Sequence, residues 1–211
     1  MNRRIVVVST CLLLTGCAGQ QTKLTKEHQL ALAAQPQVHA VHHPPSRVFS
    51  IDSTARTLLL PAPLIVLEGM AMQRDLKLED PVARVKDRLV NALQTDLGLT
   101  NVRAVSESPK DQSAETLKAT FGFGAVLEVR TRNWGLDNSR VKYSALARLT
   151  RLPDADVIWE ATCKDFVVDK GKPASAMADL TAKEGELLKA KLQQAADGCA
   201  EELVGWLLGK S

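Results

Sequence analysis

Cysteine and histidine are the residue types through which this chain could act as a nucleophile or bind a metal ion. A hydrolase of the nucleophile type needs a Ser or Cys beside a His base and an orienting acid. The four histidines are His28, His39, His42 and His43, and all precede residue 46. We place the folded domain after that residue, where it holds no histidine. The sequence therefore predicts that the protein is not an enzyme.

The segment His-Ala-Val-His-His, which contains His39, His42 and His43, could bind a transition metal. However, Pro44 and Pro45 follow it, and no nearby carboxylate or thiol completes a coordination cage. A solvated linker is the better interpretation, so we expect no metal and no cofactor. Paired acids such as Glu201 and Glu202 are typical of a solvated helix face. A hydrolase therefore remains only as an alternative.

The first sixteen residues are typical of an export signal. Arg3 and Arg4 precede an apolar run of about ten residues, whereas a membrane-spanning helix needs roughly 20. The following Leu14-Thr15-Gly16-Cys17 resembles the lipobox of bacterial lipoproteins. This resemblance implies that Cys17 is acylated, that cleavage occurs before it, and that several acyl chains give stable anchoring. In that family Ala18 is compatible with sorting to the periplasmic face of the outer membrane.

Charge and cysteine count restrict the mature chain further. Removing residues 1–16 takes away two arginines and no acids, so the formal net charge falls from +3 to +1. Nucleic-acid binding, which depends on clustered cations, is therefore not expected. Cys11 leaves with the signal and Cys17 is acylated, which leaves Cys163 and Cys199 in an oxidising compartment, where two thiols usually pair. A metal pair and two free buried cysteines remain the alternatives.

The chain divides into three parts: the signal (1–16), the acylated cysteine with a flexible tether (17–46), and one periplasmic domain (47–211). The tether is polar, Gln-rich and broken by prolines, so its low apolar content cannot offset the entropy of ordering it. The domain should open with Val48 to Ile51 and then the segment Thr57 to Val66, in which Leu58-Leu59-Leu60 is a short buried-strand candidate broken by Pro61 and Pro63.

A helix should follow from Asp80, as N-cap, to Gly98, because Val82, Val85, Leu89 and Leu93 recur at helical spacing. A short strand is expected over Val102 to Val105, and a second helix over Asp111 to Thr120.

The later half alternates with a period of two residues, which predicts an antiparallel meander. Its strands are expected over Ala125 to Trp134, Val141 to Leu149 and Val157 to Cys163. The last helix, roughly Ala176 to Leu208, has an apolar stripe that includes Cys199. Because Cys163 points inward from the last strand, both periodicities direct the two thiols to one core, and we expect a disulfide.

Two features could form a partner surface. Trp134 and Leu136 should lie at a hairpin tip, and exposed aromatic residues can anchor partners. The alternative is that Trp134 simply closes the end of the core. Arg130 and Arg132, with Lys142 and Arg148, form a basic side of the strands. Glu128 and Glu160 interleave on the same face, so cross-strand ion pairing is the favoured explanation for these charges.

The order of elements resembles the TolB amino-terminal-type domain found in envelope lipoproteins such as the curli-secretion, penicillin-binding-protein activator and GNA-type proteins. The resemblance covers about residues 57–208 and depends mainly on Phe123 to Trp134 and Val157 to Glu160. The chain departs from it at Pro61-Ala62-Pro63, where the first strand would continue.

We therefore expect an α+β fold: a mixed sheet with a C-terminal antiparallel meander, and helices mainly on one face. The resemblance implies a non-enzymatic accessory or assembly role that involves binding another envelope protein. An auxiliary lipoprotein of a lipid-transport ABC system is the alternative.

Overall fold

The computed structural model describes residues 24–45, 48–52, 62–105, 113–164, 166–171 and 173–210. The helices are α1 (Lys26–Ala33), α3 (Ala62–Asp75), α4 (Val82–Thr95), α5 (Ala114–Phe121) and α6 (Met177–Leu207). The strands are β1 (Val38–His43), β2 (Ser50–Asp52), β3 (Val102–Ala104), β4 (Ala125–Asp137), β5 (Arg140–Arg151), β6 (Asp156–Thr162) and β7 (Phe166–Val167). Among these residues, no helix combines the length and apolar character needed to cross a membrane.

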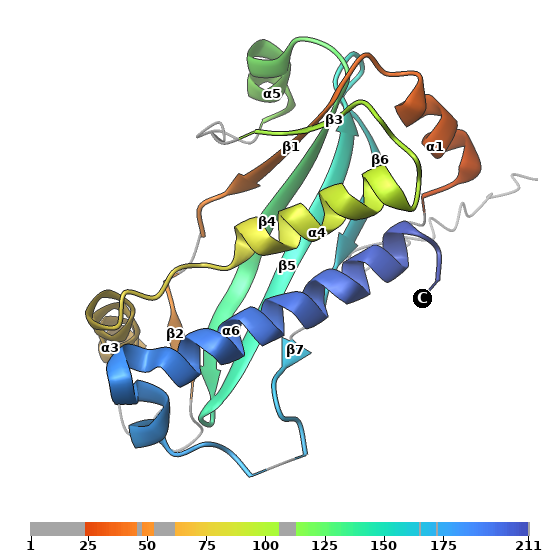
Figure 1. The fold of residues 1–211 in the computed structure, drawn as a ribbon. Helices are drawn as coiled ribbons and strands as arrows, with labels where there is room; N and C mark the ends of the chain where they lie inside the picture. Colours follow the sequence, from red (N-terminus) through yellow and green to blue (C-terminus); the bar gives the residue numbers. More distant parts are fainter. Residues whose placement is uncertain are drawn as a thin grey trace, which may run out of the picture.

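One mixed sheet organises the fold, in the order β3-β1-β4-β5-β6 (Figure 1). Strand β1 runs parallel to both β3 and β4, and β2 continues beside the far half of β4, also in parallel. Strands β4, β5 and β6 form the predicted antiparallel meander, and β7 pairs with β5. The expected α+β class with a mixed sheet is confirmed.

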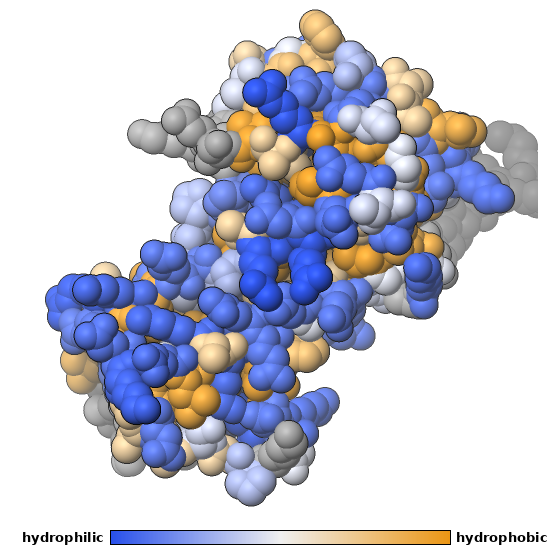
Figure 2. Space-filling view, in the orientation of Figure 1, coloured by the Kyte–Doolittle hydropathy of each residue, from blue (hydrophilic) through white to orange (hydrophobic). Residues whose placement is uncertain are grey.

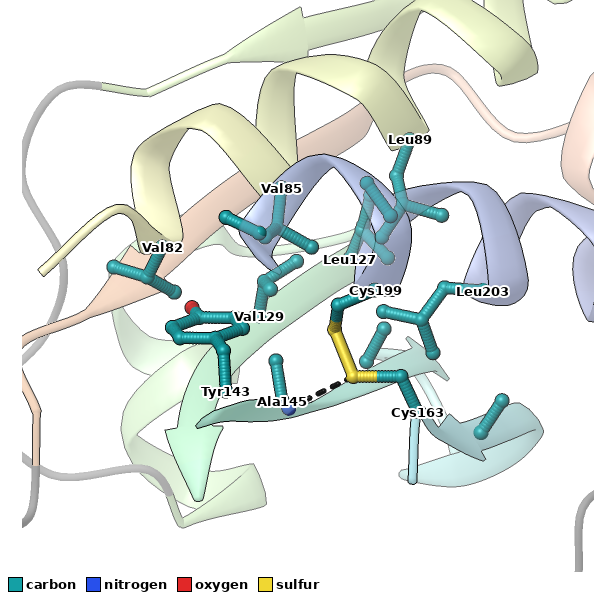
Figure 3. Packing of buried hydrophobic residues seen from close by; sticks show 14 of the residues in the cluster. Val82, Val85, Leu89, Leu127, Val129, Tyr143, Ala145, Cys163, Cys199 and Leu203 are labelled. Atoms are coloured by element: carbon teal, nitrogen blue, oxygen red, sulfur yellow. Dashed lines mark hydrogen bonds between the residues drawn. A yellow bond between two sulfur atoms is a disulfide. The ribbon is translucent and has the colours of Figure 1, made fainter. Parts of the chain in front are cut away.

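Helices α4 and α6 lie side by side across one face of the sheet (Figure 1). Their inner side chains meet the strands in a continuous apolar core, part of which is drawn in Figure 3. Their outer surfaces are largely hydrophilic (Figure 2). The short helix α5 places Leu117 against Val41, Val126 and Leu152 in a separate small cluster. The expectation that helices pack mainly on one face is confirmed.

Helix α4 follows the predicted pattern closely. Val82, Val85, Leu89 and Leu93 are buried, as their spacing requires. The helix begins at Val82, whose N–H donates to Asp80 Oδ1 at 3.1 Å. Asp80 therefore caps the helix with its side chain, as predicted, although Pro81 occupies the N-cap position. Gly98 follows the helix in a left-handed conformation, with φ +66°.

The predicted tether over residues 17–46 is wrong for residues 24–45, which belong to the fold. They form α1 and β1, and β1 is an interior strand of the sheet, between β3 and β4. Val38, Ala40 and Val41 are buried, and so is His43. The domain thus begins by Leu24 and not at residue 47. Composition misled because the strand contains three histidines, of which His43 is buried beside Glu128 and His39 stacks on Phe121.

The strand candidate Leu58-Leu59-Leu60 is not tested by the structure, whereas Ala62–Asp75, which overlaps the end of the same apolar segment, is helix α3. Residues 57–61 lie outside the described part of the chain. A proline in the first turn of a helix costs little, since N–H groups there have no helical partner, and Pro63 occupies this place. The apolar run that follows it has no clear period of two or of 3.6, so its sequence alone did not distinguish helix from strand.

Helix α6 has the predicted length but not the predicted continuity. Backbone angles are non-helical from Ala182 to Gly185, and Lys183, Glu184 and Gly185 adopt positive φ values. Gly185 is buried, and a Cβ added there would lie 3.1 Å from the Leu76 side chain. The kink therefore lets the start of α6 pack closely on the end of α3.

Candidate functional site

A disulfide joins Cys163, just after β6, to Cys199 on the inner side of α6 (Figure 3). Both residues are fully buried, and their Cα atoms are 5.3 Å apart. The Ala145 N–H of the neighbouring strand donates to Cys163 Sγ at 3.1 Å. The two periodicities thus directed the thiols to the same core, as the sequence predicted, and the pair acts as a structural cross-link.

The predicted partner surface at Trp134 and Leu136 is wrong, because both side chains have 0% exposure. Trp134 packs edge to face on Phe49, with ring centroids 5.3 Å apart. Strand β4 continues past these residues to Asp137, and the hairpin turns at Asn138 and Ser139, both with positive φ. Asn is favoured at that conformation, so the Asn-Ser pair was the available turn signal. The tip was therefore placed too early in the sequence.

The basic side of the strands is largely neutralised by neighbouring acids. Glu128 of β4, Arg148 of β5 and Glu160 of β6 face one another in direct register. Arg148 Nε donates to Glu160 Oε2 at 2.6 Å, and Lys142 forms an ion pair with Asp52. The favoured explanation, ion pairing between strands, is confirmed for these two cations.

Arg130 and Arg132 were the other two predicted surface residues. Arg130 of β4 is half-buried, and Arg132 is exposed two residues further along the strand. Trp134 and Leu136 are buried in the core, so neither arginine shares an exposed surface with them. The two candidate features, Trp134 with Leu136 and Arg130 with Arg132, therefore do not combine into one partner surface.

The histidines of β1 lie on both faces of the sheet, because side chains alternate along a strand. His43 is buried, and its Nε2 lies 3.0 Å from Glu128 Oε1. His39 stacks on Phe121 of α5, with ring centroids 4.7 Å apart. Burial, with Lys86 of α4 as the next contribution, lowers the pKa of His42. Among the described residues, no three His, Cys, Asp or Glu side chains are grouped so that they could hold a metal ion.

A buried polar cluster lies where β1 ends and α4 begins. Asp80 Oδ1 accepts hydrogen bonds from Val82 N–H, from Thr131 Oγ1 at 2.7 Å and from Tyr143 OH at 3.4 Å. Burial raises the pKa of Asp80, against the opposing effect of these hydrogen bonds. The carboxyl thus fixes the start of α4 to β4 and β5, which is a structural role.

Beside this cluster, a half-open cleft of about 480 Å³ separates the start of α4 from α6. Lys77, Glu79, Arg84 and Lys189 are among its lining residues. Arg84 of α4 donates two hydrogen bonds to Asp197 of α6, from Nε to Oδ1 at 2.6 Å and from Nη2 to Oδ2 at 2.8 Å. The lining therefore mixes both signs of charge and gives no defined preference for one ligand.

The outer side of α3 carries an exposed apolar surface, which we call the α3 face. On a helix wheel, Val66, Leu67, Met70 and Arg74 fall on one side. Leu67 is 57% exposed, and Leu64, Val66 and Met70 are each close to half exposed. Val48 adjoins Met70 in an open depression. An amphipathic helix normally turns such side chains inward, so this face has the character of an interaction surface.

Helix α3 is oriented by a backbone contact on its opposite side. Gly69 is buried there, and a Cβ added to it would lie 2.0 Å from the Phe49 carbonyl oxygen. Gln73 Oε1 accepts a hydrogen bond from Phe49 N–H at 3.2 Å, while Met72 and Leu76 pack against the main core. The helix therefore meets the fold along the side that carries Gly69, Met72 and Leu76. The residue in the sequence that could have indicated this packing is Gly69, which lies on the opposite side of the helix from Leu67.

The chain matches no family model and no curated protein sequence. Among solved structures it is similar to the PelC dodecamer protein from Paraburkholderia phytofirmans, at 11% identity over 82% of this chain and 89% of that chain, with a TM-score of 0.38. Protein XCC0632 from Xanthomonas campestris shows 17% identity, coverage of 82% and 86%, and a TM-score of 0.42. Lipoprotein GNA1162 from Neisseria meningitidis shows 17% identity, coverage of 77% and 99%, and a TM-score of 0.28. These likenesses are too low to transfer a function to this chain.

Proposed function

We propose that this protein is an acylated lipoprotein of the bacterial envelope, and that its folded domain binds another envelope protein through the α3 face. The role is that of a non-enzymatic accessory or assembly factor at the periplasmic side of the outer membrane. The exposed apolar side of α3 carries the binding proposal. The motif that ends at Cys17, which lies outside the described residues, carries the anchoring proposal.

The position of α3 favours a protein partner over the anchoring membrane. Helix α3 packs on β2, which pairs with β4 at Gly135 to Asp137, the end of that strand. Helix α1 precedes β1, whose Val38 pairs with Ala125 at the start of β4. Strand β4 has 13 residues, so at about 3.3 Å per residue its ends are roughly 40 Å apart. The α3 face is therefore far from Leu24, where the chain leads back to Cys17.

The chemistry of the α3 face defines the expected partner surface. Leu67, Met70 and Arg74 recur at spacings of three and four residues, which is the spacing of helix-in-groove recognition. Arg74 is exposed and pairs with Asp75 beside it, with Nε to Oδ1 at 2.9 Å. A partner groove should thus be apolar along its floor and polar at the rim next to these charges.

The anchoring part of the proposal predicts that Cys17→Ser yields a precursor that is neither acylated nor cleaved. Acylation requires the thiol, and cleavage at a lipobox follows acylation. Metabolic labelling with a palmitate analogue, together with the size of the product, measures both steps. Cys11→Ser, within the signal, is the matched control and should be labelled like the wild type. Equal labelling of the Cys17→Ser chain would refute the anchoring proposal.

The binding part predicts that Leu67→Glu combined with Met70→Glu weakens partner binding roughly tenfold or more, because charges replace two apolar side chains that the partner would cover. Both side chains are exposed, so the melting temperature should stay nearly unchanged. A photo-reactive residue at Val66 would report the contact in cells. Leu187→Glu, at an exposed position on α6, is the matched control. Unchanged cross-linking in the double variant would contradict the proposed surface.

A further inference from the structure

The acylated cysteine and the folded domain are separated by a short segment. Leu24 is already buried in the main core, and only residues 18–23 lie between it and Cys17. Seven residue steps, even fully extended, span at most about 25 Å. The domain therefore cannot stand several tens of ångströms from the bilayer, as a tether up to residue 46 would have allowed. This step depends on the proposed acylation of Cys17.

Because the segment between Cys17 and Leu24 is this short, one end of the sheet must stay near the membrane. We call it the α1 end, defined by residues 24–37, 121–124 and 152–156. Its segments are joined by backbone hydrogen bonds: Ala125 N–H donates to Gln37 O at 3.0 Å, and Leu152 N–H donates to Gly124 O at 2.9 Å. Helix α1 and the turn between α5 and β4 lie toward the same end of the sheet in Figure 1, away from α3.

The α1 end also carries the two most exposed large hydrophobic side chains among the described residues. Leu30 of α1 is 73% exposed, and Phe123 of the α5–β4 turn is 69% exposed. Neither belongs to the apolar clusters of the fold. A Leu and a Phe at this degree of exposure are suited to enter the boundary between lipid head groups and acyl chains.

The charged side chains of the α1 end do not favour binding to an anionic lipid surface. Lys26 is exposed at the α1 end, and Lys118 reaches this end by donating to Pro153 O, but Glu27 and Asp154 lie there as well, and Arg151 pairs with Asp154. A surface of mixed sign has no strong preference for anionic lipid. The apolar side chains are therefore the chemistry that would recognise the bilayer, and proximity set by the anchor raises their effective concentration at its surface.

We propose that the α1 end rests on the bilayer that holds Cys17, with Leu30 and Phe123 inserted at its interface. The α3 face then points away from that membrane, toward the periplasm. The acyl chains on Cys17 hold the protein on the membrane, and the weaker insertion of Leu30 and Phe123 fixes the orientation of the domain. A freely tumbling domain on the same anchor would present the α3 face in all directions.

The test places an environment-sensitive dye on one added cysteine at a time, by Leu30→Cys, Phe123→Cys or Leu67→Cys. The acylated protein is reconstituted in vesicles of phosphatidylethanolamine and phosphatidylglycerol that contain a lipid with a nitroxide on its acyl chain. We expect strong quenching at positions 30 and 123 and none at position 67. The three positions are all exposed, so the labelled chains should melt like the wild type.

The outcomes separate this inference from the proposed function. Flotation with the vesicles shows that the anchor is present, whatever the dye reports. If the protein floats but positions 30 and 123 are not quenched, or position 67 is quenched as strongly, the orientation is overturned and the anchoring stands. Photo-cross-linking of positions 30 and 123 to a protein in cells would likewise overturn it. If the protein carries no acyl chain and does not float, the anchoring proposal itself fails.

Discussion

A chain that starts at residue 46 should be unable to fold, whereas one that starts at Leu24 should melt cooperatively. The shorter chain lacks α1 and β1, and with them Val38, Ala40 and Val41, which are fully buried. Burial of one Val side chain contributes about 1.5–3 kcal/mol. The loss also leaves β3 without its partner strand and exposes the edge of β4. Together these losses approach the roughly 5–15 kcal/mol that stabilises a whole domain.

Near-ultraviolet circular dichroism and thermal melting measure the effect on the chain that starts at residue 46. If residues 24–45 were a solvated linker, both chains would melt at the same temperature, and that result would contradict the position of β1. His43→Ala gives a milder version, because it leaves Glu128 buried without its partner. Leaving a buried polar group without its hydrogen-bond partner costs about 1–3 kcal/mol. His39→Ala, at a half-buried position of the same strand, is the matched control and should cost less.

Reduction of the Cys163–Cys199 disulfide should lower the free energy of unfolding by about 3–4 kcal/mol, since the bond closes a loop with a sequence separation of 36 residues. For a domain of this size, this corresponds to a fall in melting temperature of roughly 10 °C. The loss arises because the open chain gains conformational entropy when unfolded. Helix α4 should keep its helical signal at temperatures just below the new transition.

Two chains separate the cross-link from the packing of the sulfur atoms. The reduced wild type keeps both thiols in the core and loses only the bond. The Cys163→Ala and Cys199→Ala double variant also loses the acceptor for the Ala145 N–H, so it should be less stable than the reduced wild type. Two reactive thiols in the denatured, unreduced mature protein would show that the bond is absent.

Local sequence patterns determined the meander, α4, α6 and the disulfide. In each case the pattern is repeated within one element, as in the alternation that turns Cys163 inward and the stripe that turns Cys199 inward. Such periodicity reports burial directly, because one face of the element meets the core wherever the element is placed. The Leu14-Thr15-Gly16-Cys17 motif is local in the same sense, and its consequence stays a prediction about processing.

Tertiary structure alone decided the role of residues 24–45 and the direction of α3. In strand β1, Glu128, 85 residues away, meets the buried His43, and Phe121 stacks on His39. Helix α3 turns its apolar side outward because Gly69 allows the close approach to Phe49 while α4 and α6 already cover the sheet. Contacts between distant segments set both outcomes, and no periodicity within either segment records them.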